Sequence, residues 1–166
     1  MSRLALLERA VFVDVEALRP ERHRLVKPDI PADARRFADA VGLGAAVDYV
    51  ESIGMDVIAR YEHELLVYAT EKMRTVPGLA LIGTAPEKAS VLSFTLDGHE
   101  PLEVGKALDR EGVAVRAGHH CAQPILRRFG LEATVRPSLA FYNTCADVDA
   151  LVAVLLRLQA GRGQLL

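Results

Sequence analysis

The strongest constraint on the fold of this chain is a nine-residue segment, Arg116 to Pro124, which separates two short runs of different character. It follows the run Val113 to Val115 and precedes the amphipathic residues Ile125 to Phe129. This order predicts a loop that leaves a strand and enters a helix, because Pro124 suits the first turn of a helix. Gly118, in the middle of the segment, allows a backbone conformation that a β-carbon would resist. Loops held by a rigid scaffold are where binding and catalytic residues concentrate.

The side chains of this segment suit thiol chemistry. Arg116, His119, His120 and Cys121 place a guanidinium, two imidazoles and a thiol within six residues. A thiol becomes a nucleophile only as the thiolate, and nearby cations or a helix N-terminus lower its pKa. The alternative is a buried, inert cysteine beside surface histidines, which is common for a lone free cysteine. The clustering of the four side chains favours a reactive thiol at Cys121.

The rest of the chain alternates between helical and extended patterns. Apolar spacing predicts helices at 32–53, 55–73 and 100–111, and a last helix that Thr144 begins as an N-cap with Asp147 three residues later. Strands are predicted at 79–82, 89–96, 113–115 and 134–142. This order predicts an α+β fold, in which a small mixed or antiparallel sheet of three to four strands is covered by helices.

Length and composition limit the class of protein. A chain of 166 residues supports one domain, with residues 32–166 as that domain and residues 1–31, which include a charged stretch with two prolines, as an N-terminal arm. The net charge of −2 makes nucleic acid an improbable partner, and no apolar run reaches the ~20 residues that span a bilayer. The two cysteines, Cys121 and Cys145, make no disulfide framework, so we expect the reducing cytoplasm.

Two stretches of the chain resemble a known family. Residues 113–124 are similar to the active-cysteine loop of the class V, pyridoxal-phosphate-dependent cysteine desulfurases, and most similar to the SufS-type (group II) branch, which includes selenocysteine lyases. Residues 134–144 resemble the strand and turn that carry the substrate-carboxylate arginine of this family, and the order and spacing of the two stretches match as well. The resemblance extends from about Gly42 to the C-terminus. It implies the small, C-terminal domain of a fold-type-I pyridoxal phosphate enzyme.

The resemblance also implies roles for particular residues. Cys121 would attack the sulfur of L-cysteine and hold it as a persulfide, with release of L-alanine, and Arg136 would bind the substrate carboxylate through its planar fork. Arg116 would steer the anionic substrate or stabilise the thiolate, while His119 and His120 would shape the loop and could assist proton transfer. The substrate would be L-cysteine or selenocysteine. The sulfur would pass to an acceptor protein in iron–sulfur cluster assembly.

The chain departs from the family in the cofactor site. Family members hold pyridoxal phosphate through a lysine in a large domain that this sequence does not contain, so no cofactor-binding residue is assigned here. The lysines lie in none of the family's Ser-x-His-Lys settings; they are Lys27, Lys72, Lys88 and Lys106. Just before Gly42, the family's Gly-Thr pair, which reaches a cofactor phosphate, is missing. The cofactor supplies the electron sink of this reaction, so the chain alone is not expected to desulfurate cysteine.

Three interpretations follow from this departure. The chain could be one part of a split or truncated enzyme whose cofactor domain lies on a partner chain. It could be a non-enzymatic sulfur-relay or protein-binding module, or an inactive remnant. A metal site at residues 119–121 is disfavoured, because adjacent residues seldom converge on one ion. Without a large domain, the apolar helix 32–53 needs another cover, so we expect a homodimer, a partner chain, or coverage by residues 1–31.

Overall fold

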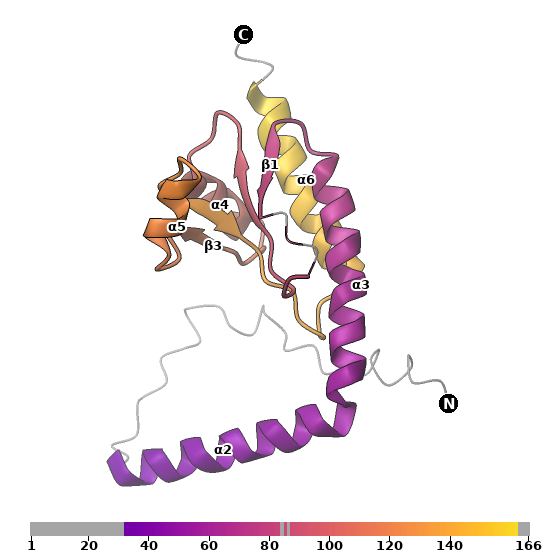
Figure 1. Cartoon of the computed structure of the whole chain (residues 1–166), viewed down its shortest axis with the longest axis vertical. Coiled ribbons are helices and arrows are strands. Elements are labelled where there is room, and N and C mark those ends of the chain that lie inside the picture. Colours follow the sequence, from indigo (N-terminus) through magenta and orange to yellow (C-terminus); the bar gives the residue numbers. More distant parts are fainter. Residues whose placement is uncertain (1–31, 84, 86, 163–166) are drawn as a thin grey trace. The chain divides into compact units, whose positions relative to one another are not determined.

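The computed structural model describes residues 32–83, 85 and 87–162, with side chains from residue 40 to residue 161 apart from 84 and 86. The described residues divide into two units, with the boundary between Ile58 and Ala59. The helices are α2 (Ala32–Ile53), α3 (Met55–Arg74), α4 (Pro101–Arg110), α5 (Gln123–Arg128) and α6 (Cys145–Arg162) (Figure 1). The strands are β1 (Leu79–Ile82), β2 (Ser93–Leu96), β3 (Arg116–Gly118) and β4 (Thr134–Arg136). The expected N-terminal arm lies outside the described residues.

The first unit contributes α2 and the first turn of α3, where Gly54 interrupts the helical run as predicted. The second unit holds the sheet. Its four strands are all antiparallel, in the order β1-β2-β4-β3. The predicted α+β class, with a small sheet of four strands and covering helices, is therefore confirmed. No helix among the described residues is both long and apolar enough to cross a membrane.

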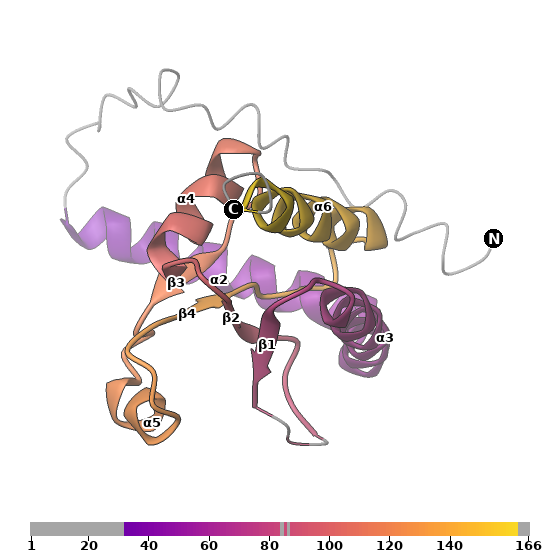
Figure 2. The ribbon, with the colours of Figure 1, turned by 90° about the horizontal axis from the view of Figure 1, so that it is seen from above.

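The pairing of the strands gives the sheet two different faces. Successive side chains of a strand point to opposite faces, and Phe94 of β2 pairs with Val135 of β4. Both are fully buried, on the face that packs against α3, α4 and α6 in one hydrophobic core. Leu81 of β1 lies opposite Phe94 and packs against the same core. The alternate residues, Thr134 and Arg136 among them, belong to the other face, and Figure 2 shows α5 on the side away from α4 and α6.

The predicted bounds of three strands are wrong. The strand expected at 89–96 begins only at Ser93. The expected strand at 113–115 is not one, because the amide of Val113 donates to the carbonyl of Leu108 and closes the end of α4. The strand begins instead at Arg116, inside the predicted loop. The expected strand at 134–142 ends at Arg136, because Pro137 has no amide hydrogen for the ladder. Only an isolated bridge, between Val91 and Ser138, continues the pairing beyond it.

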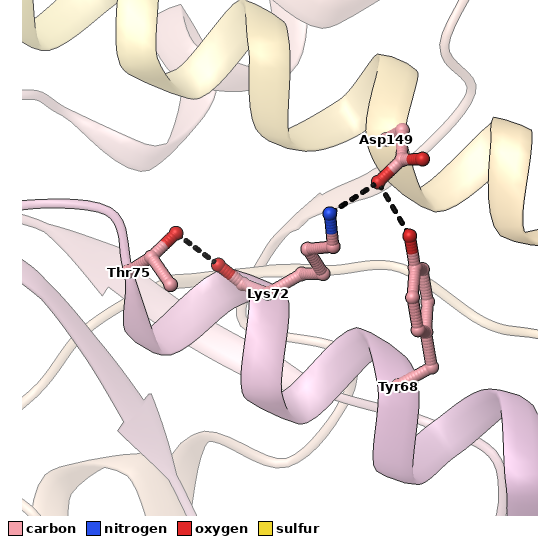
Figure 3. A network of polar contacts seen from close by, with 4 residues as sticks. All are labelled: Tyr68, Lys72, Thr75 and Asp149. Carbon is pink, nitrogen blue, oxygen red and sulfur yellow. Dashed lines mark hydrogen bonds and ion pairs between the residues drawn. The ribbon is translucent and has the colours of Figure 1, made fainter.

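Polar contacts hold the helices of the second unit together. The predicted cap of α6 is confirmed, since Asp147 accepts a hydrogen bond from the amide of Thr144 at 2.8 Å. On the surface, Asp149 of α6 accepts from the Tyr68 hydroxyl at 2.8 Å and pairs with Lys72 at 3.2 Å (Figure 3). The hydrogen bond to Asp149 raises the pKa of Tyr68, and the Tyr68 and Lys72 contacts lower the pKa of Asp149. The network is solvent-exposed and joins α3 to α6.

One glycine allows α4 to approach the site strand closely. A β-carbon built on Gly105 would lie 2.9 Å from the β-carbon of Ala117 in β3. Real β-carbons do not come this close, and both atoms belong to short, stiff groups. Gly105 therefore determines how near β3, and with it the segment that carries Cys121, can pack on α4.

We expect Gly105→Ala to lower the free energy of unfolding by about 1–3 kcal/mol, the usual cost of overpacking a filled site. Urea denaturation followed by circular dichroism measures this. The matched control is Gly161→Ala near the end of α6, where a β-carbon meets nothing within 4 Å. That control should be neutral or slightly stabilising, because alanine favours the helix. An unchanged midpoint for Gly105→Ala would contradict the close packing of α4 on β3.

Candidate functional site

The segment that carries Cys121 leaves the edge strand β3 and turns into α5. Gly118 has a φ of 133°, and His120 and Cys121 follow with φ values of 54° and 56°. Two consecutive non-glycine residues in the left-handed region cost roughly 1–2 kcal/mol each, so the surroundings must hold them there. The turn is closed by a hydrogen bond from the amide of Ala122 to the carbonyl of His119, at 2.8 Å. The predicted loop and its glycine are both present, although β3 extends into the loop.

The two histidines hold this turn from different sides. The ring Nδ1 of His119 accepts a hydrogen bond from the amide of Cys121 at 3.0 Å. The ring Nε2 of His120 lies 3.0 Å from the carbonyl oxygen of Thr134 and 2.9 Å from its Oγ1. His119 therefore acts within the turn, whereas His120 ties the turn to the neighbouring strand β4.

Cys121 is solvent-exposed, and an arginine lies next to it. The Nη2 atom of Arg116 lies 3.8 Å from Sγ of Cys121, within hydrogen-bonding range of a sulfur atom. The short helix α5 begins two residues later, at Gln123. Cys145 is also exposed, but it lies at the start of α6, away from this turn in the sequence. Arg116 thus lies next to the thiol of Cys121, and the role that the resemblance implies for it stays a prediction.

Arg136 lies directly across the ladder from Arg116. The two residues are register partners in β3 and β4, so their side chains share one face of the sheet. Neither arginine forms an ion pair with a carboxylate in the part of the chain that the structure describes. Like charges placed opposite each other destabilise a strand pair. An anion bound on this face would relieve their repulsion.

A pocket of about 230 Å³ opens on the same face. Its polar lining includes His120, Arg136, Ser93 and Thr134. Its apolar lining comes from β1, α5 and the residues that flank them: Ile82, Gly83, Ala122, Ile125, Leu126 and Phe129. Two buried atoms of the lining, Nδ1 of His120 and Nε of Arg136, have no hydrogen-bond partner within the described residues. One can accept a hydrogen bond and the other can donate one. His119 and Cys121 do not belong to this lining.

The sequence did not single out Thr134 or Ser93. Thr134 is fully buried and bonds to His120, and Ser93 reaches the pocket from β2. The signal for Thr134 was its position two residues before Arg136, which places both side chains on one face of a strand. Ser93 carried no such signal, because its place depends on the pairing of β2 with β4.

The surroundings of His120 favour its neutral form. Burial is the main cause that lowers the pKa of His120, and electrostatic interactions with Arg136, Arg116 and His119 lower it further. The backbone hydrogen bond at Thr134 opposes this shift by favouring the charged ring. The folded protein therefore binds a proton at His120 less readily than the unfolded chain does.

We expect acid to destabilise the fold through His120. Its pKa is lowered in the folded state, so its contribution is complete above the unfolded value of about 6.5 and is lost progressively as the pH falls below that value. Titration of the His120 ring protons by NMR should give a midpoint below that of histidines in the urea-unfolded chain. His120→Phe should flatten the pH dependence of unfolding between neutral and mildly acidic pH. A midpoint above the unfolded value would contradict this environment.

The described residues do not fit a Schiff-base site for pyridoxal phosphate. Lys72 and Lys106 are engaged with Asp149 and Glu103 on the surface. Lys88 lines a different groove, between α3 and β1, and Lys27 lies outside the described residues. None of the described lysines lines the pocket that holds Arg136. Within the same described ranges, no three histidine, cysteine, aspartate or glutamate side chains are grouped to hold a metal ion.

Comparison with known proteins places this geometry in a family. Residues 31–151 match the model of the aminotransferase class-V family. A cysteine desulfurase from Synechococcus elongatus is 63% identical over 137 residues, which are 79% of this chain and 22% of that protein. A probable cysteine desulfurase from Mycobacterium leprae is 62% identical over 130 residues, 78% of this chain and 21% of that protein. This chain belongs to the aminotransferase class-V family, and the resemblance seen in its sequence is confirmed.

Solved structures give the same result for the fold. A cysteine desulfurase from Thermococcus onnurineus superimposes with a TM-score of 0.70 at 35% identity, over 74% of this chain and 31% of that one. The Escherichia coli cysteine desulfurase CsdA, in an S-sulfonic acid form, gives 0.67 at 32% identity, over 72% and 30%. The chain spans about a fifth of the length of the two curated relatives named above.

Proposed function

We propose that this chain supplies the thiol and the substrate-carboxylate site of a SufS-type cysteine desulfurase. One observation supports this most directly: an exposed thiol contacts one of two cross-strand arginines that no carboxylate in the described residues neutralises. Arg116 and Arg136 together suit a small anionic substrate. L-Cysteine has such a carboxylate, and the relatives are named for acting on cysteine.

The chemistry proposed for Cys121 is sulfur transfer. The Cys121 thiolate forms an S–S bond with the sulfur of the substrate, whose Cβ–S bond breaks, and the substrate carbon takes a proton to leave as L-alanine. The result is a persulfide on Cys121. The guanidinium of Arg116, at 3.8 Å, can donate an N–H to a charged sulfur during this step. The exposure of Cys121 then leaves the persulfide open to an acceptor protein, as iron–sulfur cluster assembly in the cytoplasm would require.

The electron sink for breaking the Cβ–S bond is pyridoxal phosphate in this family. Since the described residues do not fit a Schiff-base site, we propose that this cofactor is held by polypeptide outside the described part of the chain. A sulfur-relay module is the second candidate function. Its support is that an exposed thiol held in a turn beside a guanidinium can accept sulfur from a donor without any cofactor.

The test is persulfide formation on Cys121, followed by peptide mass spectrometry. The purified chain, alone and together with a polypeptide that supplies a pyridoxal phosphate site, is given either L-cysteine with pyridoxal phosphate or inorganic polysulfide, and Cys121 and Cys145 are compared in the same sample. Sulfur gained from L-cysteine on Cys121 alone would establish the desulfurase reaction. Gain from polysulfide only would favour the relay module. Cys121→Ser should abolish the gain and Cys145→Ser should preserve it; equal labelling of both cysteines, or of neither, would refute both candidates.

We also propose that α2 mediates association with a second copy of the chain. Its apolar side chains are exposed on several sides of the helix, with Val41, Leu43 and Val47 at 72%, 67% and 46%. Exposed apolar groups clustered in this way are typical of association sites. Unlike a partner chain, a second copy requires no additional component, and coverage by residues 1–31 is the alternative that a strictly monomeric chain would favour.

We expect the full chain to sediment as a dimer, and the double variant Val41→Glu/Leu43→Glu to shift it to monomer, because burying two carboxylates opposes association. Leu102→Glu, at another exposed apolar position on α4, is the control and should leave the dimer intact. A monomer that also fails to bind other copies at high protein concentration would contradict the proposal.

A further inference from the structure

The contact between His120 and Thr134 joins the turn that carries Cys121 to the strand that carries Arg136. His120 lies in the cysteine turn, and Thr134 lies on β4, two residues before the carboxylate-binding candidate Arg136. One ring nitrogen of His120 is within 3.0 Å of both oxygen atoms of Thr134. Thr134 is fully buried, so this end of the contact is fixed by the sheet.

The chemistry of the partner atoms determines the proton position on the ring. A carbonyl oxygen can only accept a hydrogen bond, so the Nε2 atom that faces the Thr134 carbonyl carries the proton. In the neutral ring, Nδ1 is then the unprotonated atom, and it is buried against the pocket. The Thr134 hydroxyl accepts part of the same hydrogen bond, which leaves its own hydrogen free. His120 is therefore a donor to β4 rather than to the thiol.

The cysteine turn needs such an anchor. His120 and Cys121 both occupy the left-handed region, which is unfavourable for residues with a β-carbon. The hydrogen bonds inside the turn, from Cys121 to the His119 ring and from Ala122 to the His119 carbonyl, move with the turn and do not place it on the sheet. Among the described side chains of the turn itself, only the His120 ring makes a hydrogen bond to β4.

We propose that His120 and Thr134 are a positioning pair, which holds Cys121 in its left-handed turn within reach of Arg116. The inference rests on the proposed function, since it takes Cys121 as the reactive thiol. Arg116 and Thr134 lie on paired strands, with Arg116 opposite Arg136 and Gly118 opposite Thr134. A turn tied to Thr134 therefore keeps a constant relation to Arg116. A released turn would carry the thiol away from the guanidinium.

The test compares the alkylation rates of the two cysteines in the intact chain. Iodoacetamide is added at neutral pH, and the ratio of the Cys121 rate to the Cys145 rate is measured by peptide mass spectrometry. Thr134→Val should lower this ratio about fivefold, the factor that one hydrogen bond of ordinary net strength contributes. The valine methyl that replaces Oγ1 would also lie too close to Nε2 and displace the ring. Thr134→Ser keeps the hydroxyl and should restore the ratio.

The matched control is Thr95→Val, because Thr95 lies next to Phe94 and so shares the site-facing side of the sheet with Thr134. Its hydroxyl makes no hydrogen bond with a described residue, and the ratio should not change. Urea midpoints measured on all variants separate loss of fold from loss of position. If Thr134→Val does not fold, His120→Phe replaces it in the test. His120 is only partly buried, and the phenyl ring removes the nitrogen atom that contacts Thr134.

Amide hydrogen exchange at Cys121 and Ala122 gives a second readout that does not depend on thiol chemistry. Thr134→Val and His120→Phe should speed exchange at both amides about fivefold, because their acceptors belong to the anchored turn. If the wild-type chain alkylates Cys121 and Cys145 at equal rates, the reactive thiol of the proposed function is refuted. The amide exchange rates alone would then test whether the His120–Thr134 contact holds the turn. The wild-type chain could instead alkylate Cys121 much faster than Cys145. If Thr134→Val and His120→Phe then change neither this ratio nor the amide exchange rates, the positioning pair is overturned and the proposed function stays intact.

Discussion

The pairing of the three-residue strand β3 with β4 is the constraint on which the rest of the site depends. It places Arg116 opposite Arg136, Ala117 opposite Val135 and Gly118 opposite Thr134. The middle pair faces the hydrophobic core, where Val135 is fully buried, and the outer pairs belong to the other face, where Thr134 and Arg136 line the pocket. A slip of β3 by one residue would move Arg116 into the core and Ala117 out of it, while β4 stays paired with β2. The cost of burying an unpaired cation opposes that slip.

The close packing behind the sheet supports this register. Gly105 of α4 leaves room for Ala117, and Phe94 of β2 packs beside Val135 from the adjoining strand. The strands are short, so the ladder contributes few hydrogen bonds, and side-chain burial contributes most of the stability of the register. On the opposite face, the two arginines repel each other, and Nε of Arg136 has no partner within the described residues. The core thus holds a polar arrangement that is unfavourable without an anion.

The features of the site that depend on neighbouring residues could be predicted from the sequence. Cys121, Arg116, His119 and His120 lie within six residues, so any turn after a strand brings them near one another. The role proposed for Arg136 came from the family resemblance, and its place opposite Arg116 is decided by the register. The strand bounds failed where pairing overrode local propensity. The residues from Val113 to Val115 are β-branched or small, which favours a strand. However, the amide of Val113 donates its hydrogen bond to the end of α4, so it is not available for pairing with another strand.

The sequence by itself determined the α+β class, the helices, the segment that carries Cys121 and membership of a family whose relatives are cysteine desulfurases. These depend on periodicity and on residues close in the chain, which local interactions control. Only the tertiary structure decided which side chains meet across strands: Arg116 with Arg136, His120 with Thr134, and Gly105 with Ala117. Each of these contacts joins segments that are distant in sequence. Their geometry follows from strand register and helix packing, which core burial selects and no local pattern encodes.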